Sequence, residues 1–390
     1  MSSEIMPSYA RVDVAFDRGN GAYLYATDER RFLDFASGIA VTALGHNHPH
    51  LVKALTEQAG KLWHCSNLFR IPEQERLAQR LVAATFADTM FFCNSGAEAV
   101  EAGFKLIRKY HDETGNPDRY RILSFEGSFH GRTLSTITAG ANEVHKVGFA
   151  PLPEGYDHVP FGNLNAVRDA ITPETAAILV EAVQGEGGIR AADDAFLQGL
   201  RAACDEFGLL LMCDEVQTGI GRTGKLFAHE WSGVRPDVMA IAKGLGGGFP
   251  VGACLATEAA AVGITPGTHG STFGGNPLAM AVANGVLDIL LEDGFLAQVR
   301  DRGEALQSAV AALPSRWPRI IESTRGVGLM IGIKCVIPAG ELVAACNAAG
   351  LLTVPAADNV MRLLPPLIIE QNHIDEAVAM IDSACGALGP

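Results

Sequence analysis

Between about residues 50 and 290, apolar stretches with helical spacing alternate with short runs in which nearly every side chain is hydrophobic. These runs span residues 90–93, 122–125, 177–183, 209–213, 238–242 and 251–256. Strands that are apolar on both faces, with helices between them, are typical of a mostly parallel sheet that helices cover on both sides. The sequence therefore predicts an α/β fold organised around such a sheet.

The two ends of the chain show a different pattern. Short apolar runs there predict four further strands, at residues 21–25, 31–35, 328–335 and 360–364. Asn372 is a candidate cap for a closing helix in which Ile374 and Ile381 share one face. We expect one large domain over residues 49–290, and a smaller α+β domain built from both ends of the chain, residues 1–48 and 291–390.

Composition and charge exclude several classes of function. The net charge of −14 argues against binding to nucleic acids or to acidic membranes. No apolar stretch approaches the roughly 20 residues of a membrane span, and the first residues lack the basic and apolar regions of a signal peptide. The eight cysteines form no Cys-x-x-Cys pair and several lie in apolar runs. We therefore expect a cytoplasmic protein with reduced thiols and no metal site.

Polar residues that follow the predicted strands are the first candidates for a site, because ligands in open α/β sheets lie beyond the carboxyl ends of the strands. Ser95, Gly96 and Ala97 follow the first strand of the central domain and open a helix. Backbone N–H groups at such a helix start, together with the helix dipole, can hold a phosphate. An ordinary helix cap by Ser95 or Asn94 is the alternative.

Two later strands end in ionisable residues that need a chemical partner. Asp214 ends a strongly apolar strand, where a desolvated carboxylate requires a cation, and a protonated pyridine nitrogen would satisfy it. Lys243 ends the next strand among glycines. Desolvation lowers the pKa of an amine and makes it a nucleophile for an aldehyde. A lysine that extends to the surface is the alternative.

Two other strand ends give weaker signals. Phe129 could stack on an aromatic ligand and Arg132 could bind a carboxylate, although a core phenylalanine and a surface arginine explain them as well. Glu181 and Glu186 flank a glycine-rich turn, where an acid–base pair is conceivable. We favour Glu186 as the counter-charge of an arginine in the site.

A glycine-rich loop offers a competing interpretation. Residues 219–224 match the dinucleotide pattern G-x-G-x-x-G, and with Lys225 they nearly match a phosphate-binding P-loop. A P-loop requires Ser or Thr after the lysine, where this chain has Leu226, and a dinucleotide site requires a helix directly after the glycines. A nucleotide-dependent enzyme is therefore only a remote alternative.

Together these segments resemble the class III aminotransferases of the ornithine and acetylornithine type, which are fold-type I enzymes dependent on pyridoxal 5′-phosphate. The resemblance extends from about Tyr23 to the C-terminal helix. Its most specific part is Asp-Glu-Val-Gln-Thr-Gly at residues 214–219 with Lys243, 29 positions after Asp214. The resemblance implies that fold, that cofactor and a homodimer with shared active sites.

It also implies roles for individual residues. Lys243 carries the cofactor as an imine, Asp214 pairs with the ring nitrogen, and Gln217 lies near the ring hydroxyl. The remaining cofactor contacts are Phe129 on the ring face and Ser95, Gly96 and Ala97 on the phosphate, with Thr272 from the neighbouring subunit. The implied substrate contacts are Arg132 on a carboxylate, Ser271 beside the acetylated substrate, Arg362 on the α-carboxylate of glutamate, and Glu186, which neutralises Arg362 when the other substrate is bound.

Within the class, residues 35–49 and 63–75 are similar to the acetylornithine branch. That branch moves the terminal amino group of N2-acetylornithine to 2-oxoglutarate in arginine biosynthesis. Phe69 stands where these enzymes often have Tyr, and Ala182 replaces a common Pro. The alternative substrates are succinylornithine, ornithine, succinyldiaminopimelate and 4-aminobutyrate, and a non-catalytic protein of the same fold is a further alternative.

Overall fold

A seven-stranded sheet forms the centre of the structure, a computed structural model that describes residues 4–389. Its strands, in spatial order, are β4 (Thr89–Cys93), β12 (Gly252–Ala256), β11 (Val238–Ile241), β10 (Leu210–Asp214), β7 (Thr175–Val180), β5 (Arg121–Phe125) and β6 (Tyr156–Val159). Strands β11, β10, β7, β5 and β6 pair in parallel, and β12 runs antiparallel to β11 and β4. The predicted mostly parallel sheet is confirmed.

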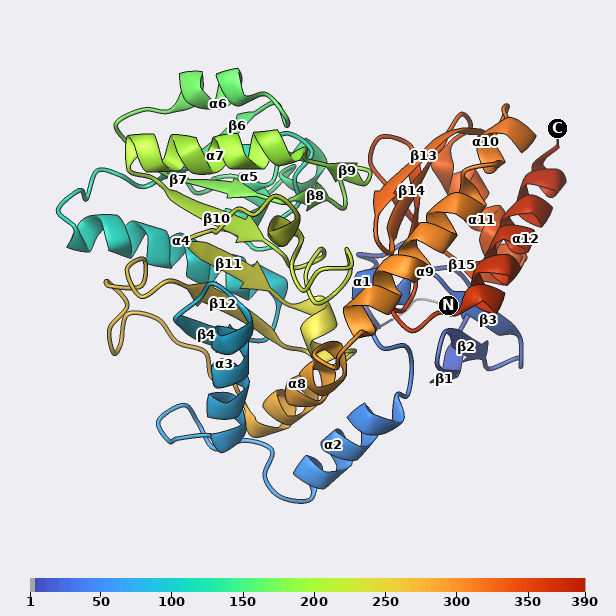
Figure 1. The fold of residues 1–390 in the computed structure, drawn as a ribbon, viewed down its shortest axis with the longest axis horizontal. Coiled ribbons are helices and arrows are strands. Elements are labelled where there is room, and N and C mark those ends of the chain that lie inside the picture. Colours follow the sequence, from blue (N-terminus) through green and yellow to red (C-terminus); the bar gives the residue numbers. More distant parts are fainter. Residues whose placement is uncertain (1–3, 390) are drawn as a thin grey trace.

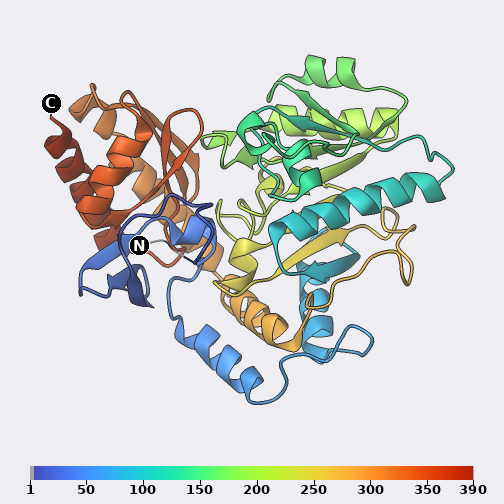
Figure 2. The same ribbon diagram turned by 180° about the vertical axis from the view of Figure 1, so that it is seen from behind.

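Helices cover both faces of this sheet. Helix α7 (Asp194–Phe207) packs with Leu211 and Cys213 of β10, whereas α4 (Gly96–Glu113) packs with the alternate residues, Leu210 and Met212. Successive side chains of a strand point to opposite faces, so the two helices lie on opposite sides of the sheet, as Figures 1 and 2 show. This arrangement explains why the strand is hydrophobic at every position.

Both chain ends contribute to the smaller part of the molecule. Strands β1 (Phe16–Asn20), β2 (Tyr23–Ala26) and β3 (Arg31–Asp34) join β15 (Leu351–Leu352) in one sheet. A second sheet consists of β13 (Ile321–Val327), β14 (Met330–Cys335), β17 (Val360–Leu363) and β16 (Val354–Ala356). Figure 1 shows these blue and red segments side by side. The domain limits at residues 48 and 290 stay a prediction, and residues 1–3 and 390 lie outside the described residues.

The remaining helices connect and cover these sheets. They are α1 (Ser37–Ala40), α2 (Pro49–Ala59), α3 (Pro72–Ala84), α5 (Leu134–Ala139), α6 (Leu164–Ala170), α8 (Pro277–Leu290), α9 (Phe295–Val310), α10 (Leu313–Arg316), α11 (Ala339–Ala348) and α12 (Gln371–Leu388). Short 3₁₀ turns occupy Glu143–His145, Ala228–Trp231 and Lys243–Gly246. Among residues 4–389, no helix combines the length and the apolar character that a bilayer crossing demands.

Three individual elements of the structure differ from the sequence-based prediction. The predicted run 177–183 is divided, because β7 ends at Val180 and β8 (Val183–Gln184) turns away to pair with β9 (Arg190–Ala191). Strand β6 was not predicted, since its residues are polar and it lies at the sheet edge. The cap of α12 is Glu370 and not Asn372, because the Glu370 N–H donates to His373 Nδ1 at 2.9 Å and the helix already begins at Gln371.

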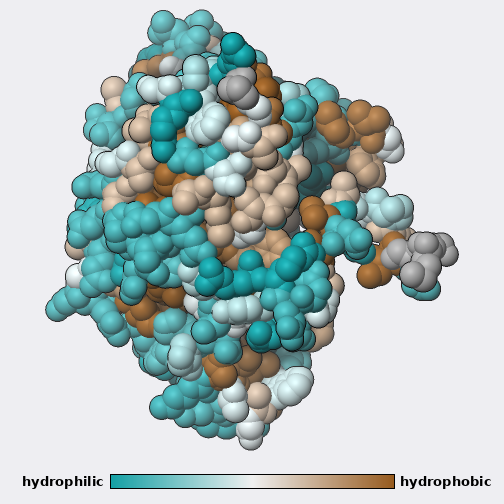
Figure 3. All heavy atoms as spheres, turned by 90° about the vertical axis from the view of Figure 1, so that its right-hand side faces the viewer, coloured by the Kyte–Doolittle hydropathy of each residue, from teal (hydrophilic) through white to brown (hydrophobic). Residues whose placement is uncertain are grey.

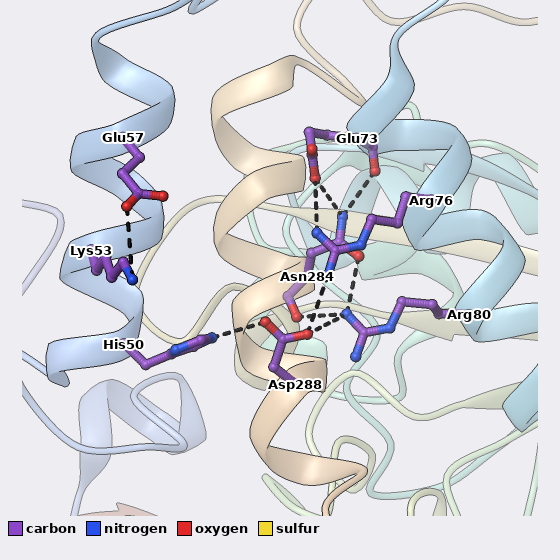
Figure 4. Close-up of polar contacts among 8 residues, drawn as sticks. All are labelled: His50, Lys53, Glu57, Glu73, Arg76, Arg80, Asn284 and Asp288. Atoms are coloured by element: carbon purple, nitrogen blue, oxygen red, sulfur yellow. Dashed lines mark hydrogen bonds and ion pairs between the residues drawn. The ribbon is translucent and has the colours of Figure 1, made fainter.

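Helices α2, α3 and α8 are connected through one carboxylate. Asp288 of α8 accepts from His50 of α2 at 2.8 Å, and it pairs with Arg80 and Arg76 of α3 at 2.9 and 3.5 Å (Figure 4). Asn284, one turn earlier on α8, donates to the Glu73 carbonyl oxygen at 2.9 Å. Helix α3 begins directly after the surface loop at residues 60–71, and the network ties its first turns to α2 and to the second half of α8.

The α1 segment is one turn of left-handed backbone. Ser37, Gly38, Ile39 and Ala40 have φ angles of 47°, 60°, 66° and 63°. This conformation costs roughly 1–2 kcal/mol for each residue that carries a Cβ. Asp34 stabilises the turn, because its Oδ1 accepts from the Ala36 and Ser37 N–H groups at 2.9 and 2.8 Å. The residue after the turn, Val41, lines the main cavity of the protein, which is described below.

Candidate active site

A cavity of 410 Å³ lies at the carboxyl ends of β4, β5 and β10. Parallel strands bring their carboxyl ends to the same edge of a sheet, so residues far apart in sequence meet there. Eight of the twelve residues predicted for the site line this cavity: Ser95, Gly96, Ala97, Phe129, Arg132, Asp214, Gln217 and Lys243. Four do not: Glu186, Ser271, Thr272 and Arg362.

The start of helix α4 forms one end of the cavity. Ser95 caps the helix, since its Oγ accepts from the Glu98 N–H at 3.3 Å. The N–H groups of Gly96 and Ala97 find no acceptor within the described residues. A Cβ at Gly96 would lie 2.6 Å from Val216 Cγ1, so only glycine fits there. Unpaired amides at the positive end of an 18-residue helix form a site suited to an anion.

Asp214 is buried at the end of β10 and has two hydrogen-bond donors. Its Oδ2 accepts from His130 Nδ1 at 2.7 Å, and its Oδ1 accepts from the Val216 N–H at 3.0 Å. Burial lowers the pKa of His130, but the hydrogen bond and the charge of Asp214 outweigh it and hold that pKa above its usual value. His130 was not predicted as a site residue, although it follows Phe129 in the segment after β5, where polar residues are candidates for a site.

Glu181 is a second buried carboxyl group in the cavity wall. It accepts from the Phe129 N–H at 3.1 Å and from the Gly185 N–H at 3.4 Å. Burial raises the pKa of Glu181 to about 7, with the negative charge of Asp214 adding to the effect and His130 opposing it. Glu181 therefore exchanges its proton near neutral pH, whereas carboxyl groups in water do so near pH 4.

Lys243 lies directly after β11, where the chain turns sharply. Its φ angle is 44°, a left-handed conformation that non-glycine residues rarely adopt and that costs about 1–3 kcal/mol. Burial lowers the pKa of the Lys243 amine, while the negative charge of Glu186 opposes the shift. The strained turn thus places an amine with a lowered pKa in the wall of the cavity.

Arg362 and Glu186 form a bidentate ion pair beside the cavity. Arg362 on β17 is 1% exposed, and its Nη1 and Nη2 lie 2.6 and 2.9 Å from the two carboxylate oxygens of Glu186. Its Nη1 also donates to Gln217 Oε1 at 3.2 Å. Although burial alone would raise the pKa of Glu186, the charge and the hydrogen bonds of Arg362 hold it below its usual value. The structure thus brings together the arginine and the counter-charge that the sequence suggested.

Arg132 lies at the exposed side of the cavity. Its guanidinium carbon is 5.5 Å from the centroid of the Phe129 ring, within the range of a cation–π contact. No ion pair joins Arg132 to a carboxylate within residues 4–389. A guanidinium that is positioned by an aromatic ring and has no acidic partner is available to a carboxylate from outside.

Ser271 and Thr272 lie outside the main cavity. They line a separate hollow of 840 Å³ with residues of the loop at 60–71. Asn67 Nδ2 donates to the Ser271 carbonyl oxygen at 3.0 Å, and Asn94 Nδ2 donates to Ser271 Oγ at 3.2 Å. Within one chain, Thr272 therefore does not line the space at the start of α4.

Residues 5–385 match the family described as aminotransferase class-III. The chain belongs to the class-III aminotransferases. It is 58% identical over 386 residues to acetylornithine aminotransferase of Mesorhizobium japonicum, covering 99% of this chain and 97% of that protein. It is 55% identical over 387 residues to acetylornithine aminotransferase of Agrobacterium fabrum, with coverage of 99% and 97%.

Solved structures agree with this assignment. The ornithine aminotransferase of Toxoplasma gondii ME49 matches with a TM-score of 0.94 at 29% identity, covering 99% of this chain and 93% of that one. N-acetylornithine aminotransferase of Stenotrophomonas maltophilia K279a matches with a TM-score of 0.86 at 38% identity, covering 97% of each chain. This class-III aminotransferase therefore has the fold-type I architecture and belongs to a class of pyridoxal-phosphate-dependent transaminases.

The glycine-rich loop of this class-III aminotransferase is not arranged as a phosphate cradle. The N–H groups of Gly219, Gly221 and Gly224 already donate to backbone carbonyl oxygens within the same loop region, at 2.9, 3.2 and 2.9 Å. Turns and bends continue to residue 227, so no helix starts at the glycines. In the described part of the chain, no group of three or more His, Cys, Asp or Glu side chains could hold a metal ion.

Proposed function

We propose that this class-III aminotransferase moves the terminal amino group of N2-acetyl-L-ornithine to 2-oxoglutarate with pyridoxal 5′-phosphate as cofactor. The products are N-acetylglutamate 5-semialdehyde and L-glutamate, a step of arginine biosynthesis in the cytoplasm. One observation carries the proposal: Lys243, Asp214 and the unpaired amides of α4 line a single cavity. The names of the relatives at 55–58% identity support the choice of substrate.

The residues of the cavity fit pyridoxal phosphate. The N–H groups of Gly96 and Ala97, with Ser95 beside them, would hold the phosphate, since they are unpaired donors at a helix start. Phe129 would cover the ring face, and Gln217 would lie near the ring hydroxyl. At the far end, Asp214 would face the ring nitrogen and Lys243 would carry the cofactor covalently. The volume of 410 Å³ suits a cofactor of this size.

When bound, pyridoxal phosphate supplies an aldehyde that accepts amines and a ring that withdraws electrons from the reacting carbon. Asp214, whose carboxylate accepts from His130 and from the Val216 N–H, would stabilise a positive ring nitrogen. Once the substrate amine has displaced Lys243 from the cofactor, the freed Lys243 amine would take a proton from the substrate carbon and return it to the cofactor; burial lowers the pKa of this amine and so favours its proton-accepting form. Positioned proton transfer of this kind contributes typically about 10²–10⁴-fold.

Two arginines would bind the carboxylates of the two substrates. Arg132 is free of acidic partners and lies at the exposed side, where it would hold a carboxylate of the acylated substrate. Arg362 would bind the α-carboxylate of glutamate or of 2-oxoglutarate. While acetylornithine is bound, Glu186 neutralises Arg362 through the bidentate pair, and this pair must open when the dicarboxylate enters.

A second copy of the chain would complete each site. Large apolar side chains lie exposed on the loop at residues 60–71 and on the loop that carries Ser271 and Thr272: Trp63 (64%), Leu68 (88%), Phe69 (67%) and Phe273 (63%). By contrast, the face in Figure 3 is largely hydrophilic, with small separate hydrophobic areas. A homodimer that buries the apolar loops would bring Thr272 of one copy to the phosphate in the other, with Ser271 beside the acylated substrate.

The visible absorbance of the purified protein tests this proposal. We expect a band from the bound cofactor that changes on addition of N-acetylornithine and returns with 2-oxoglutarate. The Lys243→Ala variant should show no such cycle, and borohydride reduction should place the cofactor on the peptide that contains Lys243. Turnover should be slower than with N-acetylornithine for the four alternative amines: succinylornithine, ornithine, succinyldiaminopimelate and 4-aminobutyrate. Fastest turnover of free ornithine would contradict the acetylornithine assignment.

A further inference from the structure

The glycine-rich loop at residues 219–226 has no role in the function proposed above. It follows the segment that carries Asp214 and Gln217, and in Figures 1 and 2 the yellow-green chain lies where the seven-stranded sheet meets the orange and red C-terminal part. The N–H groups of its three glycines already donate to backbone carbonyl oxygens, so they are not free to hold a phosphate. The loop instead packs against the C-terminal part, and one of its buried side chains forms hydrogen bonds with that part.

That side chain is Arg222, which is 2% exposed. Its Nη1 donates to the carbonyl oxygen of Leu329 at 3.0 Å and to that of Pro365 at 2.5 Å. The backbone is joined as well, because the Leu329 N–H donates to the Arg222 carbonyl oxygen at 3.1 Å. Leu329 lies in the turn between β13 and β14, and Pro365 directly follows β17.

Close backbone packing accompanies these hydrogen bonds. A Cβ at Gly328 would lie 2.5 Å from the carbonyl carbon of Thr223, and a Cβ at Gly224 would lie 2.5 Å from Cγ of Arg300. Both glycines have positive φ angles, of 56° and 89°. The glycines thus let the loop and the C-terminal part approach to backbone contact, and this explains the glycine spacing without a nucleotide.

Arg222 carries a charge that no carboxylate offsets. No ion pair joins it to an acidic side chain within residues 4–389, and its Nη2 has no hydrogen-bond partner. Burial lowers the pKa of Arg222 to about 9. A buried guanidinium that is satisfied only by carbonyl oxygens is costly, so an apolar side chain would be the more stable choice unless the geometry it imposes is needed.

The two segments that Arg222 joins carry residues that meet beside the proposed site, because Arg362 Nη1 donates to Gln217 Oε1 at 3.2 Å. Gln217 lies five residues before Arg222, and Arg362 lies three residues before Pro365. We propose that Arg222 is a positioning residue, which fixes the strand that carries Arg362 against the segment that carries Asp214 and Gln217. It thereby sets where a substrate carboxylate is held relative to the cofactor. This inference rests on the function proposed for Arg362.

Binding of glutarate to the holoenzyme tests the inference, because this five-carbon dicarboxylate has no keto group and cannot be transaminated. We expect Arg222→Met to weaken glutarate binding about tenfold in titration calorimetry, since small displacements of a binding group are costly. Affinity for pyridoxal phosphate should change less than about twofold, because its partners lie on the large sheet. Arg222→Lys, which keeps a cation able to reach one carbonyl oxygen, should recover part of the loss.

Arg302→Met is the matched control. Arg302 also donates to a carbonyl oxygen of the segment after β17, that of Leu367 at 2.9 Å, but its other hydrogen bond is to Gln298 of its own helix, α9. We expect its glutarate affinity to stay within about twofold of the wild type. Equal losses in the two variants would mean that any change near this segment weakens binding, and would overturn the role of Arg222.

Amide hydrogen exchange gives a readout that does not depend on activity. In Arg222→Met, the turn at residues 327–330 and the segment after β17 should exchange faster, while β10 and β11 stay protected. Unchanged exchange and unchanged glutarate binding, or uniform acceleration everywhere, would overturn the inference. If Arg222→Met does not fold, Arg222→Lys serves for the same comparison. A wild-type holoenzyme that binds no glutarate would refute the proposed function, whereas the exchange pattern would still decide whether Arg222 joins the two parts.

Discussion

His130 Nδ1 lies 2.7 Å from Asp214 Oδ2, and both side chains are buried at the floor of the cavity. Residues 84 positions apart thus form one unit, in which the imidazole orients the carboxylate and the carboxylate favours the charged imidazole. The positive charge on the ring nitrogen of a bound cofactor would depend on this pair. The pH dependence of protein stability can test the pair.

Replacement of His130 by Gln should reduce stability in a pH-dependent way. The pKa of His130 is raised in the folded protein, so its contribution is fully present below the unfolded pKa of about 6.5 and is lost as pH rises through the folded value. Urea denaturation of the cofactor-free protein should therefore show the largest difference between wild type and variant near pH 6, and a smaller one near pH 9. A difference that grows with pH would contradict this sign.

Replacement of Glu181 by Gln should have the opposite effect. The folded pKa of about 7 lies above the ordinary value near 4.3, so ionisation of Glu181 costs stability as pH rises through that interval. In urea denaturation, the free energy of unfolding of the variant should equal that of the wild type near pH 4.5. At pH 8 it should exceed the wild-type value by up to about 3 kcal/mol. Burial also raises the pKa of Glu230, which accepts from the Phe227 N–H at 2.8 Å and does not line the cavity, so Glu230→Gln should gain stability with pH in the same sense.

Replacement of Glu186 by Gln should alter the balance between the two half-reactions. Without the bidentate carboxylate, Arg362 is available to dicarboxylates at all times. We expect the half-reaction with L-glutamate to accelerate relative to that with N-acetylornithine by about tenfold, which corresponds to roughly 1.4 kcal/mol. Stopped-flow absorbance of each half-reaction measures this ratio, and an unchanged ratio would exclude Glu186 as the neutralising group.

Mixed dimers test the shared site. Lys243→Ala removes the amine of one copy, and Thr272→Asp places a charge that should repel the phosphate bound by the other. Random mixing gives one intact site in half of the dimers, so activity should recover to about a quarter of the wild type although each variant alone is nearly inactive. No recovery after verified subunit exchange would show that Thr272 acts within its own chain.

Replacement of Asp288 by Asn tests the network in Figure 4. The variant loses the shared carboxylate of His50, Arg76 and Arg80, so the free energy of unfolding should fall by about 1 kcal/mol at low salt and less in 1 M NaCl. The pair of Lys146 and the exposed Glu143 provides a control, because Glu143→Gln should change stability by less than about 0.5 kcal/mol. Equal effects of the two variants would show that the network adds nothing.

Much of the fold, and the site residues that follow the central strands, could be predicted from sequence, because both depend on local patterns. Asp214 and Lys243 stand out as ionisable residues at the ends of apolar strands, and parallel strands necessarily gather such ends. The polar edge strand β6 lacks the apolar signal, and β13 has only one fully buried side chain. These elements form because the sheet beside them offers free hydrogen-bonding groups, which no local pattern reveals.

The contacts that could not be predicted span long stretches of chain. The pair of Arg362 and Glu186 is separated by 176 residues, and the bond from Arg222 to Pro365 by 143. A glycine-rich loop looks alike in sequence whether it wraps a phosphate or packs against another backbone. The position of Thr272 is a further case, because its proposed partner belongs to a second molecule.

The reversed backbone turn at residues 37–40 has a consequence for how the cavity is completed. Such a turn is unfavourable in isolation, so it needs the support of Asp34, whose strand β3 pairs with β15 near the other end of the chain. The wall formed by Val41 therefore depends on segments from both ends of the chain, because residues 351–352 pair with the strand that carries Asp34. A chain truncated before these residues would keep Lys243 and Asp214 but lose part of the support for that wall.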